Sequence, residues 1–369
     1  MSQITCIVDA GAFRQALKKV LKAAVKRGTL PVLEEAYIRF DGQSCTLTCT
    51  DLELWCQASI PAQGGPCAFV LTGSRKLLSA CKYFSGSLEL SYTEDREPEG
   101  RPHNPDGQVT IRCGNKEFCR RVTTASDFPE IPQVEAEHCY DVDADALSRR
   151  FERIKYAIAA NEYGPCNCCI KFFDNRIGAV DSYRLAVSQD PALRVEVPFF
   201  LPPSALKLLP VFEGAACRLL VGKRLAAFEG GGVRVLTKIP EGEGIDFDKT
   251  IPHTCLESYT AAVPELIKDL QYLNEFNLDP NKIPIRFDGG ELSIGTAQGK
   301  CSARPELSGI PQTAFGFKGG YMLEGLKQFQ AKGAKTIVMQ LTSPIAPIIL
   351  TDYTGDLAMI LPHRPSKAA

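Results

Sequence analysis

Apolar residues spaced three or four positions apart predict an amphipathic helix at three places along the chain. Each segment opens on a residue that can cap a helix. The three segments are DAGAFRQALKKV from Asp9, DADALSRRFERI from Asp143 and SYTAAVPELIKDL from Ser258. A second helix entry follows a strand-like run in FVLTGSRKLLSAC from Phe69, FFLPPSALKLLPVF from Phe199 and FGFKGGYMLEGLKQF from Phe315.

A repeated pentapeptide lies between these helix entries. IRFDG occupies residues 38–42 and 285–289, and a looser copy, IKFFD, occupies residues 170–174. Alternating apolar and polar residues follow each copy, and Asp-Gly between alternating runs is a strong signal for a β-hairpin. The sequence therefore predicts the same strand and turn three times.

The markers recur in one order, and each series ends in Ile-Pro or Leu-Pro, at residues 131–132, 251–252 and 361–362. They step by about one domain length, whereas solenoid repeats are far shorter, at roughly 20–50 residues. We predict three repeated domains, at residues 1–133, 134–253 and 254–369. Each is an α+β unit with two helices and small antiparallel sheets.

The charge is balanced overall but unevenly distributed. The 369 residues include 42 basic and 43 acidic side chains, so net charge alone indicates no nucleic-acid or membrane partner. In the first helix Phe13, Leu17 and Val20 fall on one side. The six basic residues between Ala10 and Leu33, an interval with no acidic residue, are Arg14, Lys18, Lys19, Lys22, Lys26 and Arg27.

Basic residues also gather on other helix entries. The equivalent helix of the second repeat carries Arg149, Arg150, Arg153 and Lys155, and the last helix of the third repeat carries Lys318, Lys327, Lys332 and Lys335. A basic helix face is usually only a solvated face. Repetition across three units favours a positive surface for a phosphate backbone, and the scarcity of aromatic residues on it favours double-stranded DNA over single strands.

Signatures of catalysis, cofactor binding and metal binding are missing from the sequence. VGKR at residues 221–224 lacks the glycine-rich loop of a phosphate site, and no nucleophile elbow or zinc-protease motif occurs. Asp51 and Asp181 are interpreted as turn or capping acids. The 15 cysteines include one close group, Cys166, Cys168 and Cys169, which we interpret as structural because no further ligand completes a zinc site. We expect no catalytic residue, no cofactor and no metal.

The N-terminus and the apolar runs bear on where the protein is found in the cell. The N-terminus has no basic-then-apolar leader, and no run approaches the roughly 18 apolar residues of a membrane span. We expect a cytoplasmic protein with reduced thiols and no membrane partner.

Four longer segments resemble one known family. They are TLPVLEEAYIRFDGQSCTLTCTDLELWCQASI from Thr29, TTASDFPEIPQ from Thr123, IGAVDSYRLAVSQ from Ile177 and LAMILPHR from Leu357. In this order they resemble the bacterial DNA polymerase III beta subunit, the replicative sliding clamp. The resemblance implies a non-catalytic subunit of the holoenzyme that forms a head-to-tail homodimer ring around duplex DNA, with helices lining the channel.

The resemblance also implies a groove for short linear peptides from polymerases, the clamp loader and repair proteins. Carried over by position, its residues are Cys166, Val180, Ser182, Tyr183, Arg184, Leu185, Ile245, Lys249, Thr250, Tyr321, Ile345, Pro347, Ile360, Leu361, Pro362, His363 and Arg364. Ser182-Tyr183 replaces the Gly-His that is common in the family, and PSKAA follows Arg364. Both departures leave the preferred peptide open.

The same resemblance assigns residues to DNA and to the dimer. Arg27 falls on a DNA-contacting position, and Tyr163 lies near the corresponding region of the second domain. Phe118 falls on an apolar dimer position, and Phe276 and Leu278 are expected opposite it. The alternative to a clamp is a clamp-like, peptide-binding adaptor or decoy that does not encircle DNA.

Overall fold

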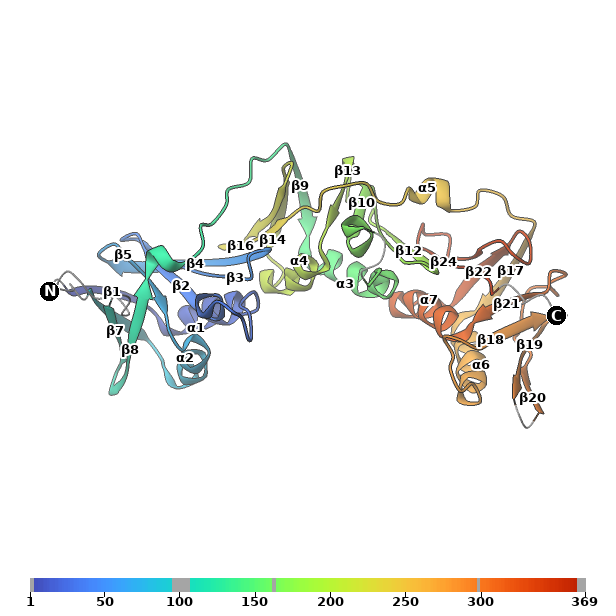
Figure 1. Ribbon diagram of the computed structural model, residues 1–369, viewed down its shortest axis with the longest axis horizontal. Coiled ribbons are helices and arrows are strands. Elements are labelled where there is room, and N and C mark those ends of the chain that lie inside the picture. The colour runs from blue at the N-terminus through green and yellow to red at the C-terminus, as the bar shows by residue number, and fades with distance from the viewer. Residues whose placement is uncertain (1–2, 95–106, 161–163, 297–298, 364–369) are drawn as a thin grey trace. The chain divides into compact units, whose positions relative to one another are not determined.

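The computed structural model describes residues 3–94, 107–160, 164–296 and 299–363 (Figure 1). The chain folds into two compact units. Unit 1 comprises Met1–Asp145 and Ser204–Ile239, and unit 2 comprises Ala146–Pro203 and Pro240–Ala369. Each unit combines segments that are distant in sequence. Both units take residues from the predicted middle domain, so the three domain boundaries stay a prediction.

Unit 1 is built on an antiparallel sheet with twelve strands among its described residues. The order is β1-β6-β7-β8-β5-β2-β3-β4-β16-β15-β14-β9, and β1 also pairs with β4, which closes the first eight strands on themselves. The strands are β1 Gln3–Asp9, β2 Ala36–Phe40, β3 Ser44–Thr50, β4 Leu54–Gly64, β5 Cys67–Leu71, β6 Ser87–Glu94, β7 Gly107–Cys113, β8 Lys116–Thr124, β9 His138–Asp143, β14 Ala216–Val221, β15 Leu225–Gly230 and β16 Val233–Lys238.

Short helices accompany this sheet. They are α1 Ala10–Val20, α2 Ser74–Ala80 and α4 Pro203–Leu208, with 3-10 turns η1 Pro31–Glu34, η2 Cys81–Tyr83, η3 Ala125–Asp127 and η6 Leu209–Phe212. In α1 the Asp9 carboxylate accepts the Ala12 amide at 2.8 Å, as the sequence predicts for a helix cap. Phe13, Leu17 and Val20 are fully buried, and α1 packs on β3, β4 and α2.

Unit 2 holds two antiparallel sheets. An eight-stranded sheet has the order β13-β10-β11-β12-β24-β23-β22-β17, and a four-stranded sheet has the order β20-β19-β18-β21. The strands are β10 Ile170–Asp174, β11 Arg176–Val180, β12 Arg184–Gln189, β13 Val195–Leu201, β17 Glu257–Ala262, β18 Pro284–Asp288, β19 Glu291–Thr296, β20 Gly299–Ala303, β21 Phe315–Lys318, β22 Thr336–Leu341, β23 Ile348–Thr351 and β24 Leu357–Ile360.

The helices of unit 2 include the longest in the described chain, α7. They are α3 Ala144–Ile154, α5 Phe247–Thr250, α6 Val263–Glu275 and α7 Gly319–Lys332, with 3-10 turns η4 Lys155–Ala157 and η5 Pro165–Cys168. Helices α6 and α7 pack against each other, and α7 also lies on β24. This mixture of helices and antiparallel sheets confirms the predicted α+β class.

The three copies of the pentapeptide form equivalent hairpins, as predicted. They give β2–β3, β10–β11 and β18–β19, each antiparallel. The first residue of each copy, Ile38, Ile170 and Ile285, is fully buried. In the first turn Gly42 has φ +105°, which favours glycine, and hydrogen bonds from Ser44 lower the pKa of Asp41 to about 2.

One predicted helix start is wrong. The sequence places a helix entry at Ser258, but Glu257–Ala262 forms β17 and the helix begins at Val263. Pairing with β22 takes up the backbone groups of this segment, and a proline in the first turn of α6 suits a helix start without any side-chain cap.

A buried polar cluster joins β12, α7 and the turn before β24. Asp356 is 1% exposed and accepts hydrogen bonds from the Gln189 amide at 2.8 Å, the Ser188 hydroxyl at 3.2 Å and Lys332 Nζ at 3.1 Å. Nearby, Gln328 Nε2 donates to the Val187 carbonyl at 2.8 Å. Each of these buried polar groups has a hydrogen-bond partner, so burying them leaves none of them unpaired. They therefore stabilise the seam between β12 and β24.

The cysteines behave mainly as small core residues. All 15 are free thiols, and Cys119, Cys139 and Cys255 are the exposed ones. Burial raises the pKa of Cys56 to about 12 and that of Cys81 to about 11. A buried thiol therefore stays protonated and unreactive at neutral pH.

Titration of the native protein with a thiol-specific chromogenic disulfide should show this division. Near neutral pH we expect a fast phase of three thiols, matching the exposed set, and reaction of the rest only after unfolding. Cys119→Ser should reduce the fast phase by one thiol. A single fast phase that consumes all thiols would contradict the burial of Cys45, Cys49 and Cys56.

Candidate functional site

Five cations on unit 1 form what we call the basic surface: Arg14, Lys18, Lys22, Lys26 and Arg27. All five are exposed. No carboxylate of the described residues forms an ion pair with any of them. Lys19, which the sequence groups with them, is half-buried and pairs with Glu213 at 3.0 Å. The basic surface thus presents free positive charge, whereas Lys19 is neutralised.

The basic surface is only partly helical. Helix α1 ends at Val20, so Lys22, Lys26 and Arg27 lie in the turns that follow it. Those turns are tied to the second helix, because Arg75 Nη2 donates to the Ala24 and Val25 carbonyls, each at 3.2 Å. The apolar positions Leu21 and Ala24 remain buried, which keeps the basic side chains outward.

Helix α2 adds cations that the sequence reasoning missed. Arg75, Lys76 and Lys82 are exposed, and α2 packs beside α1. The signal was present, since residues 74–83 contain three basic and no acidic side chains. Each member was overlooked because α2 is too short to show a clear periodic face.

In the second repeat, two of the predicted DNA-binding residues lie next to carboxylates. Arg150 pairs with Asp190 at 3.1 Å, and Arg153 donates to the Ser188 hydroxyl at 2.8 Å and lies 3.6 Å from Asp356. Both guanidinium groups therefore serve the buried polar cluster and its surroundings. Arg149 is exposed, and Tyr163 lies outside the described residues.

The basic side chains on and beside α7 also differ in their surroundings. Lys332 Nζ pairs with Asp352 at 2.9 Å and with Asp356 at 3.1 Å, so it is neutralised. Lys318 lines a pocket with Tyr183 and Tyr321. Only Lys327 and Lys335 remain as exposed cations without a described ion pair, so α7 has no continuous basic face.

The seam between β12 and β24 brings several of the predicted groove residues to one pocket. Arg184 is paired with Ile360 in register, and the Leu361 amide donates to the Tyr183 carbonyl at 2.9 Å. Two parts of unit 2 that are far apart in sequence thus meet at one pocket. We call it the tyrosine pocket, and it is lined by Tyr183, Lys282, Lys318, Tyr321, Leu361, Pro362 and His363.

Arg184 lies beside this pocket and supports Tyr321, one of its lining residues. Its guanidinium pairs with Asp181 at 2.7 Å and with Glu324, and it stacks over the Tyr321 ring at 4.4 Å. The Tyr183 and Tyr321 rings lie 5.6 Å apart. Two carboxylates thus neutralise Arg184, and the arginine holds one wall of the pocket.

The remaining predicted groove residues divide into buried and peripheral sets. Val180, Leu185 and Ile360 are buried, and Ile245 packs against the cluster that contains Val180. Cys166 is buried and its thiol donates to the Gly242 carbonyl at 3.3 Å. The remaining described residues lie outside the tyrosine pocket: Ser182, Lys249, Thr250, Ile345 and Pro347. Arg364 lies outside the described residues.

Two residues that line the tyrosine pocket, Lys282 and Lys318, were not among the residues predicted for the groove. Lys282 follows α6, whereas Lys318 ends β21 and precedes α7. Lys318 was assigned from sequence to a basic helix face. Only the spatial meeting of β12, β24 and α7 places it beside Tyr183.

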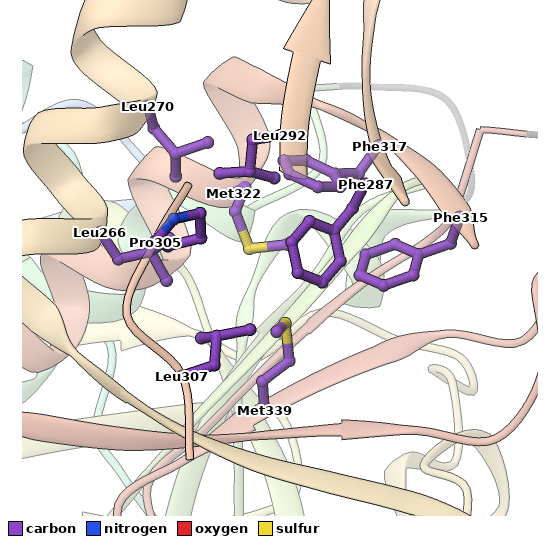
Figure 2. A pocket seen from close by; sticks show the side chains of 10 residues that line it. All are labelled: Leu266, Leu270, Phe287, Leu292, Pro305, Leu307, Phe315, Phe317, Met322 and Met339. Carbon is purple, nitrogen blue, oxygen red and sulfur yellow. The ribbon is translucent and has the colours of Figure 1, made fainter. Parts of the chain in front are cut away.

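A second cavity lies in the core around β18, β21, α6 and α7 (Figure 2). Its lining is wholly apolar: Leu266, Leu270, Phe287, Leu292, Pro305, Leu307, Phe315, Phe317, Met322 and Met339. Such a cavity has no polar side chain that could orient a ligand by hydrogen bonding. We interpret it as a packing defect of the core rather than a functional site.

The acidic residues and cysteines show local structural roles. Asp51 accepts the Glu53 and Leu54 amides at 3.0 and 2.8 Å, and Asp181 accepts the Tyr183 and Arg184 amides, both at 2.7 Å. Both are turn acids, as predicted. Within the described ranges, no three His, Cys, Asp or Glu side chains are grouped so as to hold a metal ion.

The three predicted dimer residues are accessible to different degrees. Phe118 is half-buried beneath Arg120, whose guanidinium lies 5.2 Å from the ring centre. Phe276 is 47% exposed and Leu278 is 96% exposed. Tyr272 beside them is 48% exposed and contacts Phe276 edge to face at 5.3 Å.

Comparison with known proteins shows a resemblance to sliding clamps. Residues 4–132 match the family model of the DNA polymerase III beta subunit, N-terminal domain. The beta sliding clamp of Chlamydia muridarum is 21% identical over 97% of this chain and 98% of the relative. The chain is thus similar to the DNA polymerase III beta subunit in its N-terminal part and, at low identity, to a beta sliding clamp over nearly its whole length.

Further sliding clamps are similar to the chain. The beta sliding clamp of Pseudomonas putida is 24% identical over 65% of this chain and 66% of its own. The solved clamps of Bacillus subtilis and Caulobacter crescentus superpose with TM-scores of 0.83 and 0.84, both at 18% identity, over at least 98% of each chain. These structures show that the chain has the fold of a sliding clamp.

No helix in the described part of the chain is long and apolar enough to span a membrane.

Replacing Arg153 separates a structural role from a DNA role. Arg153→Ala should lower the free energy of unfolding by about 2 kcal/mol, because it removes a charge-assisted contact to buried groups. DNA affinity should not change. Arg149→Ala on the same helix is the control, with unaltered stability. Urea unfolding and fluorescence anisotropy with duplex DNA measure both effects. Lost DNA affinity at wild-type stability in Arg153→Ala would contradict this assignment.

Proposed function

We propose that the protein is a DNA sliding clamp, a processivity factor that encircles duplex DNA and tethers the replicative DNA polymerase. The observation that carries the proposal is the basic surface of Arg14, Lys18, Lys22, Lys26 and Arg27, free of carboxylate partners among the described residues. Relatives named beta sliding clamp, matched over up to 97% of the chain, support it.

The basic surface suits sliding rather than sequence recognition. Lysine and arginine side chains attract phosphates by charge and counterion release, which is independent of base sequence. Long, exposed side chains can exchange one phosphate for the next at little cost. Affinity then comes from encirclement, and movement along the duplex meets no base-specific barrier.

Encirclement requires a ring, for which we propose a head-to-tail homodimer. Among the described residues, the Lys116–Arg121 part of β8 pairs with β7 alone, since β5 joins β8 at Val122. An open strand edge of this kind is available for a partner strand. The exposed Phe276 and Leu278 provide apolar area of the kind that a heterologous interface buries.

The tether would be the groove at the β12–β24 seam. Aromatic and apolar walls with a few polar groups are typical of sites that take a short peptide. We propose that polymerase, clamp loader and repair proteins reach this groove through short linear segments. The subunit itself would be non-catalytic and would act in the cytoplasm.

The proposal is tested by retention on DNA of defined topology. We expect the protein, loaded with a clamp loader and ATP, to stay on nicked circular plasmid through gel filtration and to leave when a restriction enzyme linearises it. A peptide-binding adaptor would show no retention on either form. Equal retention on circular and linear DNA would indicate simple binding and contradict encirclement.

Charge reversal on the basic surface should abolish this retention. The triple variant Lys18→Glu, Lys22→Glu, Arg27→Glu removes three phosphate contacts, so the slope of log affinity against log salt should fall by about 3. A matched control reverses Lys223, Lys238 and Lys300, which are exposed and pair with surface glutamates. Equal loss in both triples would show a nonspecific charge effect.

Leu278→Asp should weaken the homodimer without loss of stability. The side chain is almost fully exposed in the single chain, and burying a leucine on association is worth about 1.5–3 kcal/mol. We expect at least a roughly tenfold higher dimer dissociation constant in sedimentation equilibrium. Leu256→Asp, at a 77% exposed leucine, is the control. An unchanged constant would exclude Leu278 from the interface.

A further inference from the structure

Two thiols meet where the sheet of unit 1 closes on itself. Strand β1 pairs with β4 there, with Cys6 opposite Gly64 in register, and β5 begins shortly afterwards at Cys67. The sulfur atoms of Cys6 and Cys67 lie 3.9 Å apart. No other two cysteine sulfurs in the described ranges lie within hydrogen-bonding distance of each other. These two side chains form a pair that the proposed clamp function does not use.

The turn between β4 and β5 is shaped to bring the pair together. Gly64 has φ +137°, which favours glycine, and a Cβ there would lie 2.7 Å from Cys6 Cα and 3.1 Å from its sulfur. The Cys6 thiol also donates to the Gly65 carbonyl at 3.3 Å. A side chain at Gly64 would push β1 away, so this glycine allows Cys6 to approach the turn closely.

The two thiols differ in their access to solvent. Cys6 is 1% exposed, whereas Cys67 is half-buried and follows the exposed Pro66. Burial raises the pKa of Cys67 to about 12 and also raises the pKa of Cys6. Both thiols are therefore protonated at neutral pH and react slowly, and a small oxidant reaches Cys67 first.

A disulfide needs only a small movement from this arrangement. Bonded sulfur atoms lie about 2.05 Å apart, so the two sulfurs must approach by about 2 Å. Cys67 is the first residue of β5 and follows a turn, so rotation of its side chain and a slight shift of the turn can supply this movement. The bond would join residues 61 positions apart, and closing so long a loop restricts the unfolded chain strongly.

Cys45 is a nearby thiol that is less well placed. In register, Phe40 of β2 lies between Cys45 of β3 and Cys67 of β5. Cys45 is also fully buried. It is thus two strands away from Cys67, which makes it a matched control for the pair.

We propose that Cys6 and Cys67 form a disulfide when the protein meets hydrogen peroxide, and that this bond fastens β1 to the β4–β5 turn of unit 1. The Cys67 thiolate attacks one peroxide oxygen, which gives a sulfenic acid and, with the thiol proton, one water. The Cys6 sulfur then displaces the hydroxyl group of the sulfenic acid, which leaves with the Cys6 proton as a second water. Two thiols thus lose two electrons and two protons to one peroxide molecule.

Peptide mapping of the oxidised full chain tests the bond. The background variant Cys119→Ser, Cys139→Ser, Cys255→Ser lacks the exposed thiols, which prevents links between molecules. After treatment with hydrogen peroxide and alkylation of the remaining thiols, proteolysis and mass spectrometry should give one linked pair of peptides, containing Cys6 and Cys67. Dithiothreitol should separate them. The absence of this link, or a link from either residue to another cysteine instead, would overturn the proposal.

Fluorescence of the single tryptophan measures the effect on unit 1. Trp55 is buried on β4, the strand that pairs with β1. Oxidation of the background variant should raise the midpoint of thermal unfolding by about 5 °C or more, and dithiothreitol should reverse the rise. Adding Cys67→Ala should remove the rise, and adding Cys45→Ala should keep it.

A link between Cys6 and Cys67 without a higher midpoint would overturn the fastening of β1, and so would a rise that survives in Cys67→Ala. Peptide mapping uses the intact pair, so it decides the question of the bond even where an alanine variant does not fold.

Discussion

The pairing of β12 with β24 is the constraint on which the tyrosine pocket depends. It joins strands from the middle of the sequence to strands near residue 360 in one eight-stranded sheet. Backbone hydrogen bonds set the register, and the register decides that Tyr183 lies beside Leu361. A slip by one residue would turn every side chain of β24 to the opposite face. The pocket therefore depends first on the pairing of these strands and then on the side chains that line it.

The cationic side chains discussed above fall into two groups: those paired with carboxylates and those that face solvent. Arg150, Arg153 and Lys332 face carboxylates in and around the buried polar cluster, where ion pairs specify how the elements meet. Lys18 and Lys22 face solvent. The first group costs desolvation and supports the fold. The second group keeps its full attraction for a polyanion, so a near-neutral chain can still present a cationic surface.

Much of the fold was predictable because its signals are local. The Asp9 cap, the buried stripe of α1 and the three hairpins follow from residues within one element. What the sequence could not show was non-local. Periodicity places Arg153 on a polar helix face but cannot show that Asp356 lies opposite it. The family resemblance pointed to Tyr183 and Tyr321, whereas Lys318 became part of the pocket only through the meeting of separate segments.

The same seam has a consequence for the timing of synthesis. Ser188 and Asp356, which hydrogen-bond across it, are 168 residues apart in the chain. Contacts of such high sequence separation form late, since the intervening loop must close first. A nascent chain that has emerged only through the third hairpin has no β24, and so it lacks the tyrosine pocket. The pocket therefore forms only after nearly the whole chain has been synthesised and this strand has docked.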